Sequence, residues 1–279
     1  MTIDFDPGYT KDPWASLVRD YPDETVYPLK DFRVEWGPIF HRGRLDGTAK
    51  VLIVGQDPAA HEAVCRRILV GEAGQRAQGF LAKLGITTSY VMVNTYLYSV
   101  YGQSGGERHI DDAAIAAYRH RWFDAVVAEN PIEAIVTFGH LAKEASDQWK
   151  ATPTGAASTV PIVSLLHPTY PDSASRAQGP NHISKADAMK RLCDDWNVGL
   201  TKLSPVVTAD AAVPLVPYGV TITPAEDAVI PALDLPAGLP PWMRSLDAWA
   251  VRSGADAAEK RANVTITIPK DARTWPPIG

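Results

Sequence analysis

The sequence predicts an α/β fold, a three-layer α/β/α arrangement around a central, mainly parallel four-stranded sheet, with a proline-rich C-terminal extension. Apolar, β-branched runs alternate with amphipathic helical stretches through the middle of the chain, which is typical of a parallel sheet covered by helices. The runs are short and apolar throughout, as expected for strands that are buried on both faces. The predicted strands are residues 50–55, 90–94, 133–138 and 160–166.

Amphipathic periodicity predicts helices between and after these strands. One is expected over about residues 75–84, a second after Asp111 or Asp112, which are favourable N-cap residues, and a third after Gly139. A closing helix follows the last strand, and Cys193 lies on its apolar face, which predicts a buried, reduced thiol. The other apolar residues of that face are Ile183, Ala186, Met189, Leu192 and Trp196.

Three parts are expected along the chain: an N-terminal flank over residues 1–48, the α/β domain over residues 49–200, and an extension over residues 201–279 that packs on the core. A short helix is expected near Trp14 and a turn at Trp36. The extension is rich in proline, but Trp242, Trp249 and Trp275 argue against simple disorder. Within it, residues 220–223 and 264–268 are predicted strands and residues 241–250 a short helix.

Composition narrows the class of protein. The chain has 27 Lys and Arg against 32 Asp and Glu, a net charge of −5, so binding to DNA would need a local basic rim. Two cysteines are too few for a disulfide framework or a four-thiolate cluster, and we expect no metal and no other cofactor. We expect a cytoplasmic protein with no membrane partner, because the chain shows no apolar span and no signal-peptide pattern at its start. We also expect a monomer. Candidates for the rim are Arg66, Arg67, Arg176, Lys185 and Lys190.

A carboxylate, side-chain amides and imidazoles follow the four predicted strands. Because the carboxyl ends of parallel strands meet at one edge of a sheet, we expect these side chains to converge there. A carboxylate can orient water and stabilise an oxocarbenium-like sugar, and a fixed Asn amide can distinguish uracil from cytosine. A histidine can donate a hydrogen bond to a leaving base anion. The residues at the strand ends are Gln56 and Asp57, Asn94, His140, and His167.

These motifs resemble those of the uracil-DNA glycosylase superfamily. Residues 55–58, Gly-Gln-Asp-Pro, are similar to the first motif of family 1, Gly-Gln-Asp-Pro-Tyr-His, and residues 167–168 are similar to the start of its second motif, His-Pro-Ser. Asn94 and Gly139 follow in the shared order, and the resemblance covers about residues 36–196. Seven residues also match the spacing of the family 4 motifs, which read Gly-Glu-x-Pro-Gly-x-x-Glu followed by Pro-Phe-Val-Gly-x-Ala-Gly. They are Gly55, Pro58, Glu62, Val70, Gly71, Ala73 and Gly74.

The resemblance implies a monofunctional enzyme that flips uracil out of single- or double-stranded DNA and hydrolyses its N-glycosidic bond, with residues 49–200 as the catalytic domain. It implies that Asp57 activates water, that His167 stabilises the uracil anion, that Asn94 selects the base and that Gln56 contacts uracil O2. Structural alternatives are a helix cap for Asp57 and turn or loop roles for the others. The motifs contain no lysine for a Schiff-base lyase step. His61, Glu62 and His140 are kept outside the predicted catalytic core.

Two base-binding positions depart from the family patterns. Ala59 stands where family 1 has the tyrosine that blocks the thymine methyl group, so either another wall excludes thymine or the selectivity is looser. Leu69 stands where family 4 spacing has the aromatic that stacks on the base, with Phe80 or Tyr98 as candidate replacements. The mixed motifs, without iron–sulfur cysteines, predict a divergent and cluster-free member of the superfamily.

The segment after the second motif departs as well. Residues 169–175 replace the Pro-Leu-Ser of family 1, so Tyr170 or a neighbour is expected to fill the gap left by the flipped base. Ser173 and Arg176 are further candidates for DNA contact, although Arg176 and His182 suit a plain surface role equally well.

Two other functions stay open at this point. The residues at positions 59 and 69 are compatible with a protein that binds uracil or abasic DNA with weak or no turnover. An α/β enzyme of nucleotides unrelated to DNA is the other alternative, and the lack of a glycine-rich phosphate loop argues against it.

Overall fold

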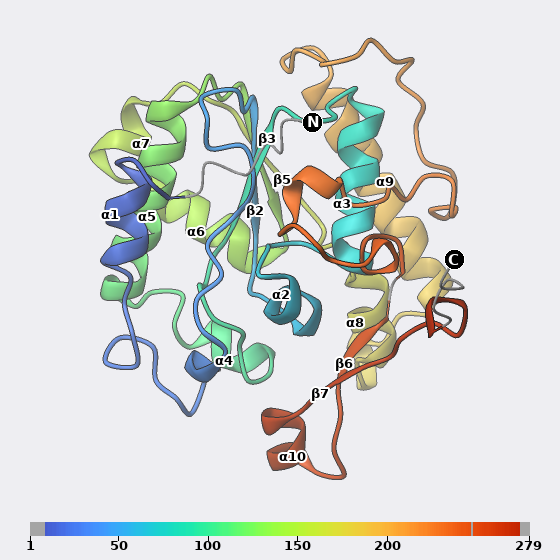
Figure 1. The fold of residues 1–279 in the computed structure, drawn as a ribbon. Helices are drawn as coiled ribbons and strands as arrows, with labels where there is room; N and C mark the ends of the chain where they lie inside the picture. Colours follow the sequence, from blue (N-terminus) through green and yellow to red (C-terminus); the bar gives the residue numbers. More distant parts are fainter. Residues whose placement is uncertain (1–8, 247, 274–279) are drawn as a thin grey trace, which may run out of the picture.

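The computed structural model describes residues 9–246 and 248–273, and over these residues five strands form one mixed, mostly parallel sheet flanked by helices (Figure 1). The predicted α/β fold is confirmed, and each predicted strand of the core lies within two residues of its expected ends. In spatial order β1-β3-β2-β4-β5, the strands are Arg42–Gly43, Tyr90–Asn94, Val51–Gly55, Ala134–Phe138 and Ile162–Leu165.

β2 is the central strand of the sheet. It pairs in parallel with β3 and β4, and β4 pairs in parallel with β5. The antiparallel edge strand β1, with Arg42 opposite Met92, was not predicted, because two residues are too few to give a strand pattern. The parallel strands consequently all point their carboxyl ends to the same edge.

Alternate residues of the strands face two separate apolar cores. Leu52 and Val54 of β2 belong to the cluster formed with α1, α5 and α6, whereas Val51 and Ile53 belong to the cluster formed with α3 and α9. These helices cover opposite faces of the sheet (Figure 1). None of the helices in the described part of the chain has the length and apolar character needed to cross a membrane. Their bounds are Trp14–Arg19 for α1, Glu72–Lys83 for α3, Ala113–Glu129 for α5, His140–Lys150 for α6 and Lys185–Leu203 for α9.

Two of the main helices, α5 and α9, begin at a residue whose side chain accepts from their first backbone N–H groups. The Asp112 carboxylate accepts from the N–H groups of Ala114 and Ile115 at the start of α5, at 3.0 and 3.4 Å. Ser184 caps α9. Cys193 of α9 is fully buried, as predicted.

Short helices occupy several connections. Residues 170–176 form α8, which has a proline in its first turn. α2 follows β2 directly and lies at the carboxyl edge of the sheet (Figure 1). The short elements are α2 (Ala60–Cys65), α4 (Gln103–Glu107), α7 (Pro153–Ala157) and α8 (Tyr170–Arg176), with 3₁₀ helices η1 (Val34–Trp36) and η2 (Gly179–Asn181).

The C-terminal extension packs on both α2 and the α3/α9 side of the sheet. Val207 and Tyr218 join the core of α3 and α9, and Met243 and Trp249 form a third apolar cluster with α2. Trp275 lies outside the described residues. The elements of the extension are η3 (Ala232–Asp234), η4 (Pro241–Arg244), β6 (Ala250–Arg252), α10 (Ala257–Ala262), β7 (Val264–Ile266) and η5 (Asp271–Arg273).

Two predictions within the extension are wrong. Residues 220–223 are irregular rather than a strand, and the Thr223 N–H donates to the Glu226 carboxylate at 2.9 Å instead of joining a ladder. Residues 241–250 are not one helix, because Trp249 is buried against α2 and Ala250 pairs with Ile266 of β7. The predicted strand at 264–268 is present as the shorter β7.

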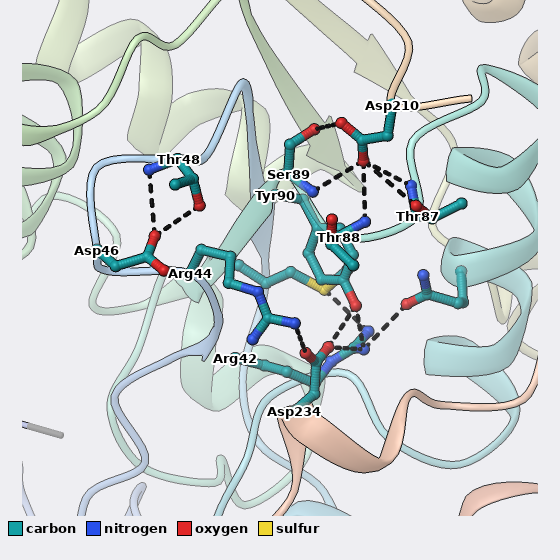
Figure 2. Close-up of polar contacts among 12 residues, drawn as sticks. Arg42, Arg44, Asp46, Thr48, Thr87, Thr88, Ser89, Tyr90, Asp210 and Asp234 are labelled. Atoms are coloured by element: carbon teal, nitrogen blue, oxygen red, sulfur yellow. Dashed lines mark hydrogen bonds and ion pairs between the residues drawn. The ribbon is translucent and has the colours of Figure 1, made fainter. Parts of the chain in front are cut away.

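A buried ion pair joins the extension to the sheet (Figure 2). The side chains of Arg42 and Asp234 are fully buried, and Arg42 Nη1 lies 3.0 Å from Asp234 Oδ2. The Tyr90 hydroxyl donates to the same carboxylate, and Arg44 Nη2 lies 3.5 Å from its other oxygen. Arg42 Nε also donates to the Ile68 carbonyl at 2.8 Å, so this pair connects η3, β1, β3 and the loop before α3.

Replacing Asp234 with Ala is expected to lower the free energy of unfolding by about 3–5 kcal/mol, because the Arg42 guanidinium would stay buried without a counter-ion. Denaturant unfolding measures this change. Asp46→Ala is the matched control, since Asp46 only accepts bonds from Thr48 in an exposed turn and its loss should cost about 1 kcal/mol or less. If Asp234→Ala lowered the free energy of unfolding by an equally small amount, the Arg42–Asp234 pair would not have the stabilising role assigned to it.

Candidate functional site

The ends of β2 and β3 bring Gly55 and Asn94 into contact. The two residues are register partners, and the pairing continues beyond the strands because the Tyr96 N–H donates to the Gln56 carbonyl at 3.0 Å. A Cβ atom on Gly55 would lie 2.3 Å from Asn94 Oδ1, closer than any side chain permits. The absence of a side chain at Gly55 therefore allows the Asn94 amide to lie across the end of β2.

The ends of β4 and β5 add Gly139 and His167 on the other side of β2. Gly139 has a φ of +90°, and a Cβ there would lie 3.0 Å from Gln56 Oε1 and 3.3 Å from the Cβ of His167. Gln56 Oε1 is buried and has no hydrogen-bond partner among the described residues. A buried acceptor of this kind is satisfied when a ligand or water donates to it.

Leu69 lies beside Gly55, and Glu62 fixes the loops that carry Leu69 and Ala59. Leu69 Cδ1 lies 3.7 Å from the position of a Cβ on Gly55. Glu62 accepts from the Ala59 N–H through one oxygen and from the Val70 N–H through the other, both at 3.0 Å. Burial raises the pKa of the Glu62 carboxyl to about 7, although these two hydrogen bonds act to lower it. Glu62 is therefore a positioning residue, while the exposed Ala59 forms no wall of its own.

Asp57 is half-buried, and its Oδ2 accepts from the Val100 N–H at 3.1 Å. Burial raises the pKa of Asp57 to about 6, while this hydrogen bond and the charges of Arg252 and Arg33 act in the opposite direction. The structural alternative of a helix cap does not hold over the described residues, because Glu62 rather than Asp57 accepts the N–H at the start of α2.

His167 is held as a neutral imidazole. Burial lowers its pKa to about 4, and the positive charge of Arg76 adds to this effect. Its Nδ1 accepts from the Thr169 N–H at 3.2 Å and lies 2.9 Å from Thr169 Oγ1. An accepting Nδ1 leaves the proton on Nε2, so the ring presents an uncharged N–H donor.

The aromatic residues considered for DNA recognition pack or form hydrogen bonds within the protein. Phe80 is fully buried against Phe138 and Trp196, and the Tyr98 hydroxyl donates to the Pro22 carbonyl. Tyr170 packs against the α3/α9 core, and its hydroxyl accepts from Arg191 at 3.3 Å. Ser173 and Arg176 are exposed on α8.

Two further histidines noted in the sequence, His61 and His140, make other contacts. His61 packs edge-on against Trp249 and its Nε2 accepts from the Ala250 N–H at 3.4 Å, so it connects α2 to the extension. His140 is exposed at the start of α6, 3.6 Å from Glu107.

Sequence reasoning missed three contributors to the site. The Val100 N–H is a backbone donor, and the residue type does not indicate where a backbone group donates. Arg76 donates to the Pro168 carbonyl at 2.7 Å from inside α3, and Arg252 comes from the distant extension. Thr169 lies two residues after His167, and its N–H donates to His167 Nδ1. This short spacing was the local feature from which the histidine tautomer could have been predicted.

Residues 42–189 match the Uracil DNA glycosylase superfamily, which is more than half of the chain. The protein belongs to this superfamily, and membership indicates an N-glycosylase that acts on DNA. No curated protein matches the chain. The matched region runs from β1 into the first turns of α9 and leaves the extension outside.

The iron–sulfur site of the family 4 branch has no counterpart in the donor set of this chain. Cys65 and Cys193 are its two cysteines, and they are buried in different apolar clusters. These residues do not fit a cluster ligated by four thiolates.

The His167 ring is expected to titrate near pH 4 and to carry its proton on Nε2, because burial and the Thr169 N–H both disfavour the cation. Nitrogen chemical shifts of the imidazole, followed against pH and assigned with His167→Ala, measure both properties. Titration close to the ordinary value of about 6.5, or a proton on Nδ1, would contradict the described environment.

Proposed function

We propose that this protein is a monofunctional uracil-DNA glycosylase that hydrolyses the N-glycosidic bond of uracil in DNA and leaves an abasic site. The observation that carries the proposal is the convergence of Asp57, Gln56, Asn94 and His167 at one edge of the sheet, within a chain that belongs to the superfamily. A base acceptor, a water-activating group and a neutral donor for the leaving group are thereby available together.

Base selection falls to Asn94 in this proposal. Its side-chain oxygen accepts from uracil N3–H and its NH₂ group donates to O4, whereas cytosine offers an acceptor at N3 and a donor at position 4. The contact of this amide with Gly55 restricts its orientation, which a fixed selector requires. The Gln56 loop and Leu69 complete the contacts with the base.

Hydrolysis falls to Asp57 and His167. Ionised Asp57 orients and deprotonates a water molecule that attacks C1′, and its charge stabilises the oxocarbenium-like sugar. The electron pair of the broken bond goes to uracil N1, and the resulting anion is stabilised at O2 by the His167 Nε2–H. A neutral imidazole suits this role because its Nε2–H stabilises the anion by a hydrogen bond, and the ring does not have to be an imidazolium cation.

A binding protein with weak turnover is the second candidate, and one observation favours it. Leu69 replaces the stacking aromatic, and both proposed substitutes, Phe80 and Tyr98, are held in other contacts. The flipped base would then lack an aromatic partner at these positions.

Exclusion of thymine is also expected to be weak, because Ala59 is small and exposed.

Asp57→Asn is expected to lower the single-turnover rate of uracil excision by about 10²–10⁴ and His167→Ala by about 10²–10³. A gel assay on a uracil-containing oligonucleotide measures the alkali-labile abasic product and the shifted complex together. Asp46→Asn, the same chemical change in an exposed turn before β2, is the control that should keep full activity.

The same assay separates the alternatives. A uracil-dependent shift without abasic product from the unmutated protein supports the binding function. Equal binding to DNA with and without uracil, together with no product, contradicts both candidates.

The excision rate is expected to rise with pH through about 6 and then level off. Asp57 must lose its proton to act, and its pKa is about 6, whereas His167 is already neutral above about pH 4. A pH profile of the single-turnover rate measures this rise. Glu62 has a pKa of about 7, so Glu62→Gln distinguishes the two carboxyls. The rise must persist in that variant, and its loss there would assign the dependence to Glu62.

A further inference from the structure

The end of the extension forms an arm at the carboxyl edge of the sheet. β6, α10 and β7, residues 250–266, project beyond that edge on the side of α2 and α8 (Figure 1). The base of the arm is fixed to α2, because Trp249 and Ala250 share an apolar cluster with Ala60 and both contact His61. α2 begins three residues after Asp57, so the arm starts next to the catalytic loop.

A second contact joins the arm to the loop after β3. The Arg261 guanidinium of α10 lies 4.5 Å from the centre of the Tyr101 ring, and Arg33 lies 4.1 Å from the same centre. Arg33 also donates to the Val100 carbonyl at 2.8 Å, and the N–H of Val100 donates to Asp57. Both contacts of the arm are therefore with segments that adjoin Asp57, namely α2 and the loop whose Val100 N–H bonds to its carboxylate.

Arg33 and Arg261 both lie against the Tyr101 ring, and the charge of Arg252 acts on Arg33. We call Arg33, Arg252 and Arg261 the arginine cluster; among the described residues none of them has a carboxylate at ion-pair distance. Arg33 is only 3% exposed, while Arg252 and Arg261 are exposed. Burial and then the charge of Arg252 lower the pKa of Arg33 to about 10, whereas Tyr101, Glu35 and Asp57 act in the opposite direction. Crowding of cations around a buried arginine is unfavourable by itself and becomes favourable when an anion is bound.

The acidic residues of the arm are occupied by its own backbone. Asp256 caps α10 by accepting from the Glu259 N–H at 2.9 Å, and Glu259 accepts from the Ala255 N–H at 2.7 Å. Neither carboxylate lies at ion-pair distance from Arg252 or Arg261, and Arg261 is directed to Tyr101 in the loop next to Asp57.

The basic rim expected from the sequence is largely engaged within the protein. Arg66 donates to the carbonyls of Trp36 and Pro38, both at 2.6 Å. Lys185 pairs with Asp172 at 2.8 Å and Lys190 with Asp194 at 2.6 Å. In a chain with a net charge of −5, the arginine cluster is therefore a local source of positive charge at the site itself.

We propose that the arm is a phosphate clamp in which Arg252 and Arg261 bind backbone phosphates of the DNA strand beside the flipped nucleotide, with Arg33 adding positive charge beneath them. The proposal rests on the proposed function, because it assumes that Asp57 acts on a nucleotide in DNA. Phosphates on both sides of the target would then hold the sugar over Asp57, and the arm gives the extension a role in substrate binding.

Salt dependence of DNA binding tests the clamp. Arg252→Gln, Arg261→Gln and the double variant are compared with the unmutated protein by fluorescence anisotropy, using a duplex that contains 2′-fluorinated deoxyuridine, whose glycosidic bond resists cleavage. Each lost phosphate contact is expected to reduce the slope of log K against log salt by about 0.9 and to weaken binding roughly fivefold at physiological salt. The double variant should show about twice the change in slope.

The control is Lys202→Gln, which removes an exposed positive charge at the far end of α9 and should leave the slope unchanged. Thermal melting confirms that each variant folds. An unchanged slope, or tighter binding by the arginine variants, would overturn the clamp even if the unmutated protein excises uracil. An unmutated protein that neither binds nor cuts uracil DNA would overturn the clamp and the proposed function together.

Discussion

The parallel pairing of β2 with both β3 and β4 is the constraint on which the site depends. It directs three strand ends to one edge and sets Gly55 opposite Asn94, with Gly139 and His167 on the other flank. Both faces of the sheet are buried, so a shift of register would move apolar side chains such as Leu52 and Ile53 to the wrong core. The hydrophobic cores thereby maintain the positions of the polar residues at the edge.

The extension reinforces this arrangement from outside the family region. Asp234 pairs with Arg42, which in turn holds the Ile68 carbonyl before α3, and Asp210 accepts the N–H groups of residues 87, 88 and 89 before β3 (Figure 2). Although burial alone would raise it, these bonds hold the pKa of Asp210 well below its usual range. Segments remote in sequence therefore help to position the strands and loops that carry Asn94 and Leu69.

Sequence patterns predicted the features that depend on local chemistry. The four parallel strands and the Asp112 cap follow from apolar runs and capping preferences, and the rule for strand ends predicts that Asp57, Asn94 and His167 lie at one edge of the sheet. Features that depend on distant partners were missed or mistaken. The strand β6 requires β7 as its partner, and the charge of Arg252 acts on the pKa of Asp57 only because the arm folds against the core. The contacts that hold Phe80 and Tyr98 elsewhere depend on tertiary packing.

In the proposed function, uracil is bound between Asn94, Gln56 and His167 with its sugar beside Asp57. A crystal structure of the protein bound to an oligonucleotide with 2′-fluorinated deoxyuridine is the decisive measurement. We expect a flipped uracil with Asn94 bonded to N3 and O4, the His167 Nε2 bonded to O2, and a water molecule between Asp57 and C1′. A base that remains stacked in the duplex, or that binds at another surface, would contradict it.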